Sequence, residues 1–231
     1  MSQNTNDATI PAMDTTAGPL SRPGRKMRAG IRRTLARVAR RAATCRREGA
    51  RGERGAVLVE FAIIFPLLVT ITFGIVEYSG AYHDSAIAAD AARAGGRVGS
   101  ALGTNTAYAS SITDAVNAAL STLPADEPQE LWIYKANVNG YPGAGTDFSS
   151  CAANCIKYLW NPGTRVFDTG NPQGGGWPAS TQQVCTEPYD ELGVYVKLDH
   201  KFVTGLFGAN VTLQDHSVFR FEPVPTSVCA P

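Results

Sequence analysis

One carboxylate lies inside a long apolar run, and its chemistry requires an explanation. The run AVLVEFAIIFPLLVTITFGIV covers residues 56–76, and Glu60 is its only charged residue. An ionised side chain costs about 2.5–3.5 kcal/mol at the centre of a membrane-spanning helix and less near the interface, so it is expected to have a partner. Either Glu60 reaches the headgroups from its place one turn into the helix, or it meets a cation that the run itself lacks.

Cleavage of the chain directly after Gly55 would supply such a cation. Ala56 would then carry a free α-amine, one helical turn away from Glu60. When apolar helices pack together, the carboxylate of one copy can pair with the amine of the next, and such a charged pair sets the register of a helical assembly. If the chain is cut there, Gly55 and Ala56 form the cleavage site and Glu60 is the assembly carboxylate.

The three histidines give little indication of catalysis. His83 follows the apolar run, and His200 and His216 fall in predicted strands beside Asp199 and Ser217. Neighbouring strand residues point to opposite faces of a sheet, so neither pair forms a contact between a nucleophile and a base. We expect His200 and His216 on the solvent-facing side of the sheet.

Recognisable enzyme motifs are also missing from the sequence. It contains no GxSxG, HExxH or phosphate-binding loop. The glycine-rich stretch GNPQGGGWP (residues 170–178) has no strand-to-helix context and is predicted to be a loop, and a glycosylation triplet at Asn210 is too short to be specific. We expect neither an enzyme nor a cofactor, and a secreted enzyme with an unfamiliar site is the alternative.

Four cysteines gather in the C-terminal part of the chain, whereas a fifth, Cys45, lies near the N-terminus. The four are Cys151, Cys155, Cys185 and Cys229. An even number in a loop-rich region predicts disulfides in an oxidising compartment, and three pairings are possible. The spacing of CAANC also suits a zinc ligand pair, but no second close pair follows it. The sequence therefore favours disulfides and no metal, with zinc as the alternative.

Charge divides the chain into a basic and an acidic part. Of 21 Lys and Arg, 13 lie within residues 22–54, whereas only four of the 20 acids precede Ala56. The N-terminal part thus carries about +9, and the remainder about −8. Residues 1–24 are polar and predicted to be disordered. Residues 25–55 form a basic leader, which is either an amphipathic helix on anionic lipid or a flexible arm. Nucleic-acid binding is less favoured, because no aromatic residues or folded nucleic-acid-binding element accompany the arginines.

The apolar run has the length and flanks of a transmembrane helix. Its 21 residues match the roughly 20 that cross a bilayer. Bases precede it and Glu77 and Asp84 follow it, so the positive-inside rule places the N-terminus in the cytoplasm and the cysteines outside. A cleaved secretory signal is the alternative, because small residues follow within residues 86–96.

Beyond the run, the hydrophobic periodicity changes from helical to extended. The helix is expected to continue over residues 77–103, and an apolar stripe at the helical period predicts a second helix over residues 106–124. Strands are predicted at residues 131–138, 193–203 and 210–223, with short ones inside the Gly- and Pro-rich region between the first two. Residues 104–231 are therefore predicted to form an α+β extracytoplasmic domain with an antiparallel sheet.

The run ERGAVLVEFAIIFPLLVTITFGIVEYSGAY resembles the TadE-like family of the tight-adherence (Flp) pilus system. More broadly it resembles type IV pilins, whose basic leader ends in Gly and whose mature helix has Glu in fifth place. The matching residues are Gly55, Ala56, Glu60, Phe61, Pro66, Phe73, Gly74, Glu77 and Tyr78. The likeness extends less specifically to residues 88–97 and 196–223, and the region between Tyr141 and Pro188 matches no family.

The resemblance implies a minor pseudopilin or assembly factor, anchored by one helix in the cytoplasmic membrane. It implies membrane lipid, prepilin peptidase, the major Flp pilin, a TadF-like pseudopilin, and the platform proteins and ATPase as partners. A leader of 55 residues is long for this family, so a start at Met27 or a separate role for the basic arm is an alternative. An uncleaved, membrane-anchored binding module is the rival function.

Overall fold

The computed structural model describes the backbone of residues 29–224 and 229, and the side chains of residues 55–224 and 229. The prediction of disorder for residues 1–24 lies outside this part, as do the side chains of the basic leader. The chain divides into two units, between Ile64 and Phe65. The first contains the N-terminal part of helix α1, and the second contains the rest of α1 and every other described element.

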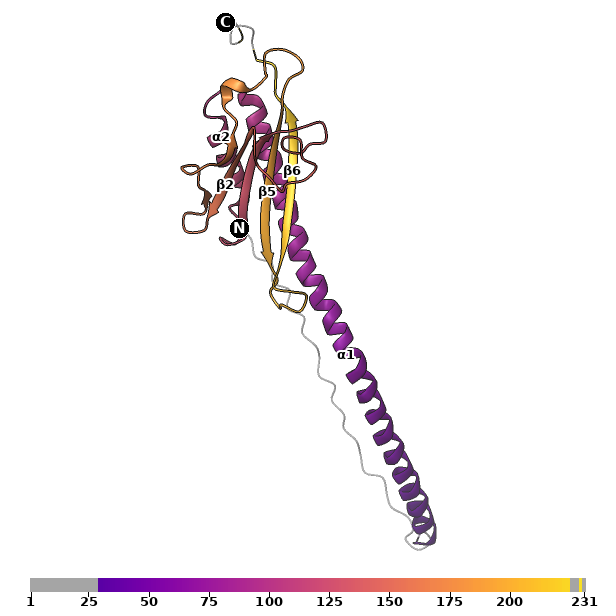
Figure 1. Cartoon of the computed structure of the whole chain (residues 1–231). Helices are drawn as coiled ribbons and strands as arrows, with labels where there is room; N and C mark the ends of the chain where they lie inside the picture. Colours follow the sequence, from indigo (N-terminus) through magenta and orange to yellow (C-terminus); the bar gives the residue numbers. More distant parts are fainter. Residues whose placement is uncertain (1–28, 225–228, 230–231) are drawn as a thin grey trace, which may run out of the picture. The chain divides into compact units, whose positions relative to one another are not determined.

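The elements form the predicted α+β fold (Figure 1). They are α1 (Ala29–Leu102), α2 (Tyr108–Leu120), β1 (Pro128–Lys135), β2 (Cys155–Asn161), β3 (Val166–Phe167), β4 (Gln173–Gly176), a 3₁₀ turn (Ala179–Thr181), β5 (Glu191–Lys201) and β6 (Asn210–Arg220). The strand order is β3-β2-β1-β5-β6, β4 pairs with β2, and all these pairings are antiparallel. The second helix and the strands agree in kind with the predictions, and the bounds of α2, β1, β5 and β6 differ from them by a few residues. Helix α1 ends one residue before the predicted end but begins at Ala29, so its backbone is helical through the described part of the basic leader as well.

Small residues on α1 let the sheet and α2 approach it closely. A Cβ on Gly96 would lie 2.3 Å from the ring of Phe219, and one on Gly99 would lie 2.3 Å from Leu192. The Ser217 hydroxyl of β6 donates a 2.6 Å hydrogen bond to the carbonyl of Ala92. The close contacts that these glycines permit stabilise α1, which continues as far as Leu102.

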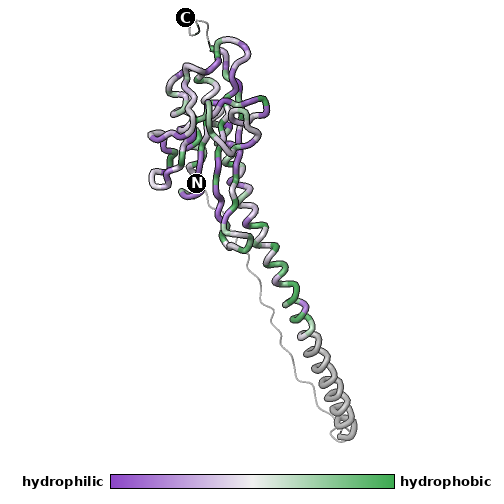
Figure 2. The backbone as a smooth tube through the Cα atoms, in the orientation of Figure 1, coloured by the Kyte–Doolittle hydropathy of each residue, from purple (hydrophilic) through white to green (hydrophobic). Residues whose placement is uncertain are grey.

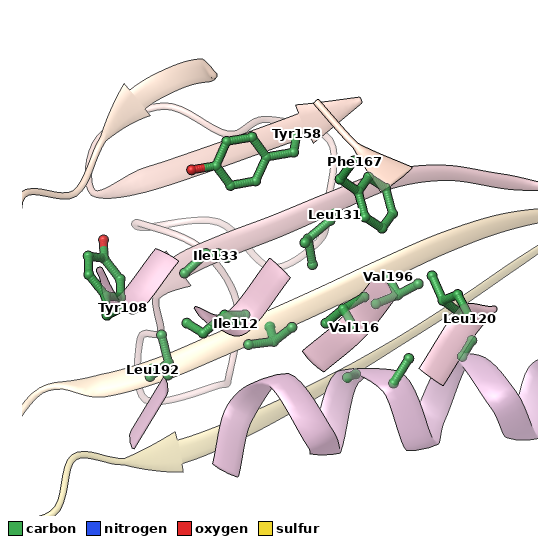
Figure 3. Packing of buried hydrophobic residues seen from close by; sticks show 14 of the residues in the cluster. Tyr108, Ile112, Val116, Leu120, Leu131, Ile133, Tyr158, Phe167, Leu192 and Val196 are labelled. Atoms are coloured by element: carbon green, nitrogen blue, oxygen red, sulfur yellow. The ribbon is translucent and has the colours of Figure 1, made fainter. Parts of the chain in front are cut away.

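The apolar stripe of α2 fills the space between α1 and the sheet. Ile112, Val116 and Leu120 recur at the helical period and are almost fully buried. Figure 3 shows these side chains among those of β1 and β5, including Leu131, Leu192 and Val196. This cluster is the main core of the domain, and the periodicity of the sequence predicted its helical part.

The opposite face of the sheet has an aromatic cluster of its own. Alternation along β1 sends Leu131 and Ile133 into the main core and Trp132 and Tyr134 to the other face. Phe148, from the loop between β1 and β2, stacks on Tyr195 at a ring separation of 4.1 Å. Part of the region that matched no family is therefore a cover for this second face.

The glycine-rich stretch predicted to be a loop contains a strand, so that prediction was wrong for residues 173–176. Gly174 and Gly176 have positive φ angles of 89° and 69°. Gly175 donates its backbone N–H to the Ala152 carbonyl at 2.7 Å, and a Cβ at that position would lie 2.1 Å from the same oxygen. Glycines form β4 because the CAANC turn presses directly against its backbone.

Two disulfides resolve the three possible pairings of the C-terminal cysteines. Cys151 bonds to Cys155, which closes the turn beside β4. Cys185 bonds to Cys229 across 44 residues of sequence. The predicted use of these cysteines as disulfides is confirmed.

Candidate functional site

Helix α1 has an uninterrupted apolar stretch whose side chains are not used by the fold. Over its described part, from Gly55 to Leu102, an 18-residue window has a mean hydropathy of 2.4 and none of it is buried. Leu58 and Ile63, for example, are 68% and 72% exposed. Figure 2 shows hydrophobic residues gathered along this stretch. The helix is thus long and apolar enough to span a membrane.

The two threonine hydroxyls of this stretch are hydrogen-bonded within the helix. Pro66 lies inside α1 and has no N–H to give to the carbonyl four residues earlier. The hydroxyls of Thr70 and Thr72 donate 2.8 Å hydrogen bonds to the carbonyls of Pro66 and Leu68. Such back-bonding hides hydroxyls from an apolar solvent and is common beside prolines in spanning helices.

The predicted cleavage and assembly residues lie on exposed helix. Gly55, Ala56 and Glu60 are all exposed. A Cβ built on Gly55 would meet nothing within 4 Å, so no packing contact explains the glycine. The sequence has no Lys or Arg between Glu60 and Arg93, so the helix offers this carboxylate no nearby base on its C-terminal side.

Glu77 has a structural role that the sequence did not reveal. Glu77 is buried, with 2% of its surface exposed. Its carboxylate accepts hydrogen bonds from the backbone N–H groups of Val203, at 2.9 Å, and of Thr204. Both donors belong to residues 202–209, the connection between β5 and β6, which we call the hairpin tip. Hydrogen bonds to an ionised acceptor are about twice as strong as neutral ones, so Glu77 holds this tip against α1.

Aromatic contacts extend the same junction along the helix. The ring of Tyr78 lies 6.0 Å from that of Phe202 and 5.8 Å from that of Phe207. The Phe207 ring also lies 3.2 Å from the place of a Cβ on Gly74. Three residues of the predicted family signature, Gly74, Glu77 and Tyr78, therefore meet at the hairpin tip, whereas Phe61 is exposed on the apolar stretch.

A buried acid–histidine cluster lies further along α1. The Nδ1 atom of His200 is 2.6 Å from an oxygen of Asp84 and 3.6 Å from one of Glu127. Each of the three residues is less than 10% exposed. The prediction of a solvent-facing His200 was wrong, because α1 covers this end of β5 and carries the carboxylate that pairs with the ring.

Glu127 is the carboxyl of this cluster that favours its neutral form. Burial raises the pKa of Glu127, and the nearby Asp84 carboxylate acts in the same direction. The three residues offer ligand atoms that lie within 4.8 Å of one another and are of types that bind transition metals, but the 2.6 Å contact between His200 and Asp84 already joins two of these residues.

His216 lies on the exposed face, as predicted. Its ring stacks on Tyr141 and contacts Phe148 beside a shallow hollow lined by both rings. Asp199 and His200 point to opposite faces, as strand geometry requires, since Asp199 instead accepts the hydroxyl of Thr212 at 2.8 Å. Among the described residues, the His200 ring pairs with a carboxylate and the His216 ring packs against aromatic rings, so neither contact supplies a nucleophile.

The sequence contained only a faint signal for the residues that it failed to predict. Asp84 and His200 are 116 residues apart, so no local pattern joins them. The hairpin tip, FVTGLFGA, had a clearer signal, because a connection between two strands is ordinarily polar. The apolar, uncharged composition of this connection is therefore the sequence signal that sets it apart.

The structure thus defines an α+β protein with one candidate membrane-spanning helix that continues into the domain. Part of this helix has a family likeness: the model of the family described as TadE-like protein matches residues 55–97. The resemblance to the TadE-like family is confirmed over this segment. No curated protein matches the chain, and no solved structure matches it.

The matched segment includes the exposed apolar stretch of α1 and the residues of α1 that contact the hairpin tip. It begins at Gly55, contains Glu60, Pro66, Gly74, Glu77 and Tyr78, and ends at Arg97. Asp84 also lies inside it, whereas the hairpin tip and all four disulfide cysteines lie outside. The likeness therefore concerns α1, and it supports a membrane protein related to the Tad pilus.

Proposed function

We propose that this protein is a TadE-like minor pseudopilin or assembly factor of a Flp-type pilus, cleaved by prepilin peptidase and anchored in the cytoplasmic membrane. The single observation that carries the proposal is the exposed apolar helix with Glu60 in fifth place after Gly55, inside the segment that matches the TadE-like family. No enzymatic activity is part of the proposal.

Gly55 supports the cleavage step. Glycine in a helix interior costs about 1 kcal/mol relative to alanine. The space around Gly55 would accept a side chain, and its φ is not among the positive values. Since the described fold has no need of glycine here, recognition by a peptidase explains its presence better than packing does.

Glu60 supports the assembly step. Its carboxylate is exposed on an apolar helix, where lipid is a poor solvent for charge. Cleavage after Gly55 creates an α-amine at Ala56, which can pair with Glu60 of a neighbouring protomer. The partners follow from this step: membrane lipid, the peptidase, the major Flp pilin, a TadF-like pseudopilin, and the platform proteins and ATPase.

The proposed topology places the N-terminus in the cytoplasm and the disulfide-bonded domain outside. The basic residues before Gly55 favour the cytoplasmic side by the positive-inside rule. Disulfides at Cys151–Cys155 and Cys185–Cys229 suit an oxidising compartment. These two arguments are independent and agree.

The test compares Glu60→Ala and Glu60→Gln with the wild type in cells that make the pilus machinery. We expect membrane insertion and a mature N-terminus at Ala56 in all three, whereas both variants fail to enter the assembled complex. Glu222→Gln, which alters an exposed carboxylate in the domain, is the matched control and assembles normally.

Mass spectrometry of the mature N-terminus and co-purification with pilus components are the two measurements. Normal assembly of both Glu60 variants would contradict the role of the carboxylate. An intact basic arm on the membrane-bound wild-type protein would favour the rival function, an uncleaved anchored binding module.

A further inference from the structure

We propose that the hairpin tip, residues 202–209, is a second membrane contact that lies in the outer interface of the bilayer beside α1. The occupant of this surface is lipid. The proposal rests on the proposed membrane-spanning role of α1, and it assigns a membrane-binding role to a part of the chain outside the segment that matches the TadE-like family.

The tip exposes large apolar side chains. Val203 is 90% exposed, Leu206 is 61% exposed and Phe207 is 38% exposed. The sequence contains no charged residue between Lys201 and Asp215. Apolar side chains displayed together at the end of a hairpin mark an interaction surface, because water alone gives no reason to keep them there.

The position of the tip along α1 suggests lipid as the covering material. Phe207 contacts the helix at Gly74, two residues before the end of the predicted span. At 1.5 Å per residue, that contact lies about 3 Å inside the apolar boundary. The tip is therefore level with the last turn of the apolar stretch, where the acyl chains meet the headgroups. Figure 1 shows the β5–β6 connection beside α1.

Several backbone N–H groups of the tip are hydrogen-bonded within the protein. Glu77 accepts the N–H groups of Val203 and Thr204. Phe202 donates to the Ala209 carbonyl at 3.1 Å, and Leu206 donates to the Thr204 hydroxyl at 3.3 Å. Unpaired backbone groups are costly in lipid, so these internal hydrogen bonds favour insertion.

Two exposed tyrosines follow the apolar stretch of α1 within two helical turns. Tyr78 and Tyr82 are 59% and 80% exposed. Tyrosine is enriched at membrane–water interfaces, where its ring and hydroxyl meet different solvents. Tyr78 packs on Phe202 and Phe207, so one interfacial tyrosine of α1 and the tip form a continuous surface.

Two membrane contacts would fix what one helix alone leaves free. A single spanning helix can rotate and tilt, whereas a second contact held by Glu77 restricts both motions. The β5–β6 edge of the sheet would then keep a defined direction relative to the bilayer. The inferred consequence is that the domain is presented in one orientation to whatever it assembles with.

The test places a single additional tryptophan in the full chain, in vesicles of phosphatidylethanolamine and phosphatidylglycerol. Leu206→Trp reports on the tip, and Val138→Trp, at a position 98% exposed, is the matched control on the domain. Leu67→Trp reports on the predicted span. Lipids brominated near the carbonyls or near the chain ends quench tryptophan at a corresponding depth, and the unsubstituted chain gives the background of the three native tryptophans.

We expect the emission of Leu206→Trp to shift to the blue and to be quenched by the shallow bromines, with Val138→Trp unchanged. Quenching of Leu67→Trp without quenching of Leu206→Trp would overturn the hairpin inference and leave the spanning helix intact. If neither is quenched, the proposed anchoring fails. A blue shift at Leu206→Trp that depends on protein concentration and not on bromine would show a protein partner and would also overturn the inference.

Discussion

Three glutamates of this chain show how environment decides the role of one side chain. Glu60 is exposed on an apolar helix, and we propose that it pairs between protomers. Glu77 is buried and accepts hydrogen bonds from two backbone N–H groups, so it holds the hairpin tip against α1. Glu127 is buried beside the Asp84 carboxylate, which favours the protonated form. The three residues are chemically identical, and their different roles follow from the groups that surround each of them.

Glu127 leads to a pH-dependent prediction at the residue scale. Because its pKa is raised in the folded state, the folded chain binds this proton more tightly than the unfolded chain. The stabilisation is complete below the ordinary pKa of 4.5 and is lost as the pH rises through the raised value. Glu127→Gln keeps the neutral shape, so its melting temperature should fall less than that of the wild type as the pH rises above 4.5.

Thermal unfolding of the full chain in detergent micelles, followed by circular dichroism at several pH values, measures this difference. Glu222→Gln is the control, and its melting curve should follow the wild type at every pH. Parallel wild-type and Glu127→Gln profiles across the range would show that Glu127 does not titrate in this way. Asp84 and His200 face the same carboxyl and are unchanged in both proteins.

At the scale of elements, α1 has two parts that differ in the kind of side chain they carry. Its apolar residues before Glu77 are large and exposed, whereas beyond that point alanine and glycine face the sheet. Small residues permit the close packing seen at Gly96 and Gly99. One uninterrupted helix therefore carries an exposed apolar part, long enough to span a membrane, and a part that forms the core of the domain.

Two glycines of α1 should respond oppositely to the same substitution. A Cβ on Gly99 would lie 2.3 Å from Leu192 and 2.5 Å from Ile112, and both of these side chains are fully buried. Gly99→Ala should therefore lower the free energy of unfolding by about 1–3 kcal/mol through overpacking. A Cβ on Gly80 would make an ordinary 3.4 Å contact with His200, so Gly80→Ala should be neutral or slightly stabilising.

Chemical unfolding of the full-length proteins in the same micelles compares the two variants directly. The pair shares one substitution and one helix, so helix propensity cancels in the comparison. Equal stability of Gly99→Ala and Gly80→Ala would contradict the close packing of α1 on the sheet.

At the scale of the whole molecule, the two disulfides constrain very different lengths of chain. Cys185–Cys229 ties the C-terminal end to the loop before β5, across 44 residues. Cys151–Cys155 closes a five-residue turn, with a sequence separation of 4. In the chain-entropy account, the longer loop gains more from its cross-link.

Removing the bonds one at a time should reveal this difference. The pair Cys185→Ser with Cys229→Ser should lose about 4 kcal/mol, and the pair Cys151→Ala with Cys155→Ala about 2 kcal/mol, by loop-closure entropy. Alanine is chosen for the second pair because Cys155 is fully buried. Urea unfolding without reductant measures both, and a larger loss for the shorter loop would contradict the expected order.

Features that depend on local pattern were predictable from the sequence. Four such features can each be recognised within a few turns or a few residues of sequence: the apolar run, the isolated Glu60, the helical stripe around Ile112 and the alternating strands. Their positions were right to within a few residues because burial requires the same periodicity wherever the element packs. The pairing chemistry of four cysteines was predictable in kind from their number alone.

Features that depend on distant neighbours required the tertiary structure. Three contacts join residues that no local pattern connects: the disulfide between Cys185 and Cys229, the hydrogen bonds of Glu77 to the hairpin tip, and the contact of His200 with Asp84. The glycine-rich β4 was missed for a similar reason, since its backbone conformation follows from contact with Ala152. Periodicity records which face of an element is buried, whereas only packing decides what that face meets.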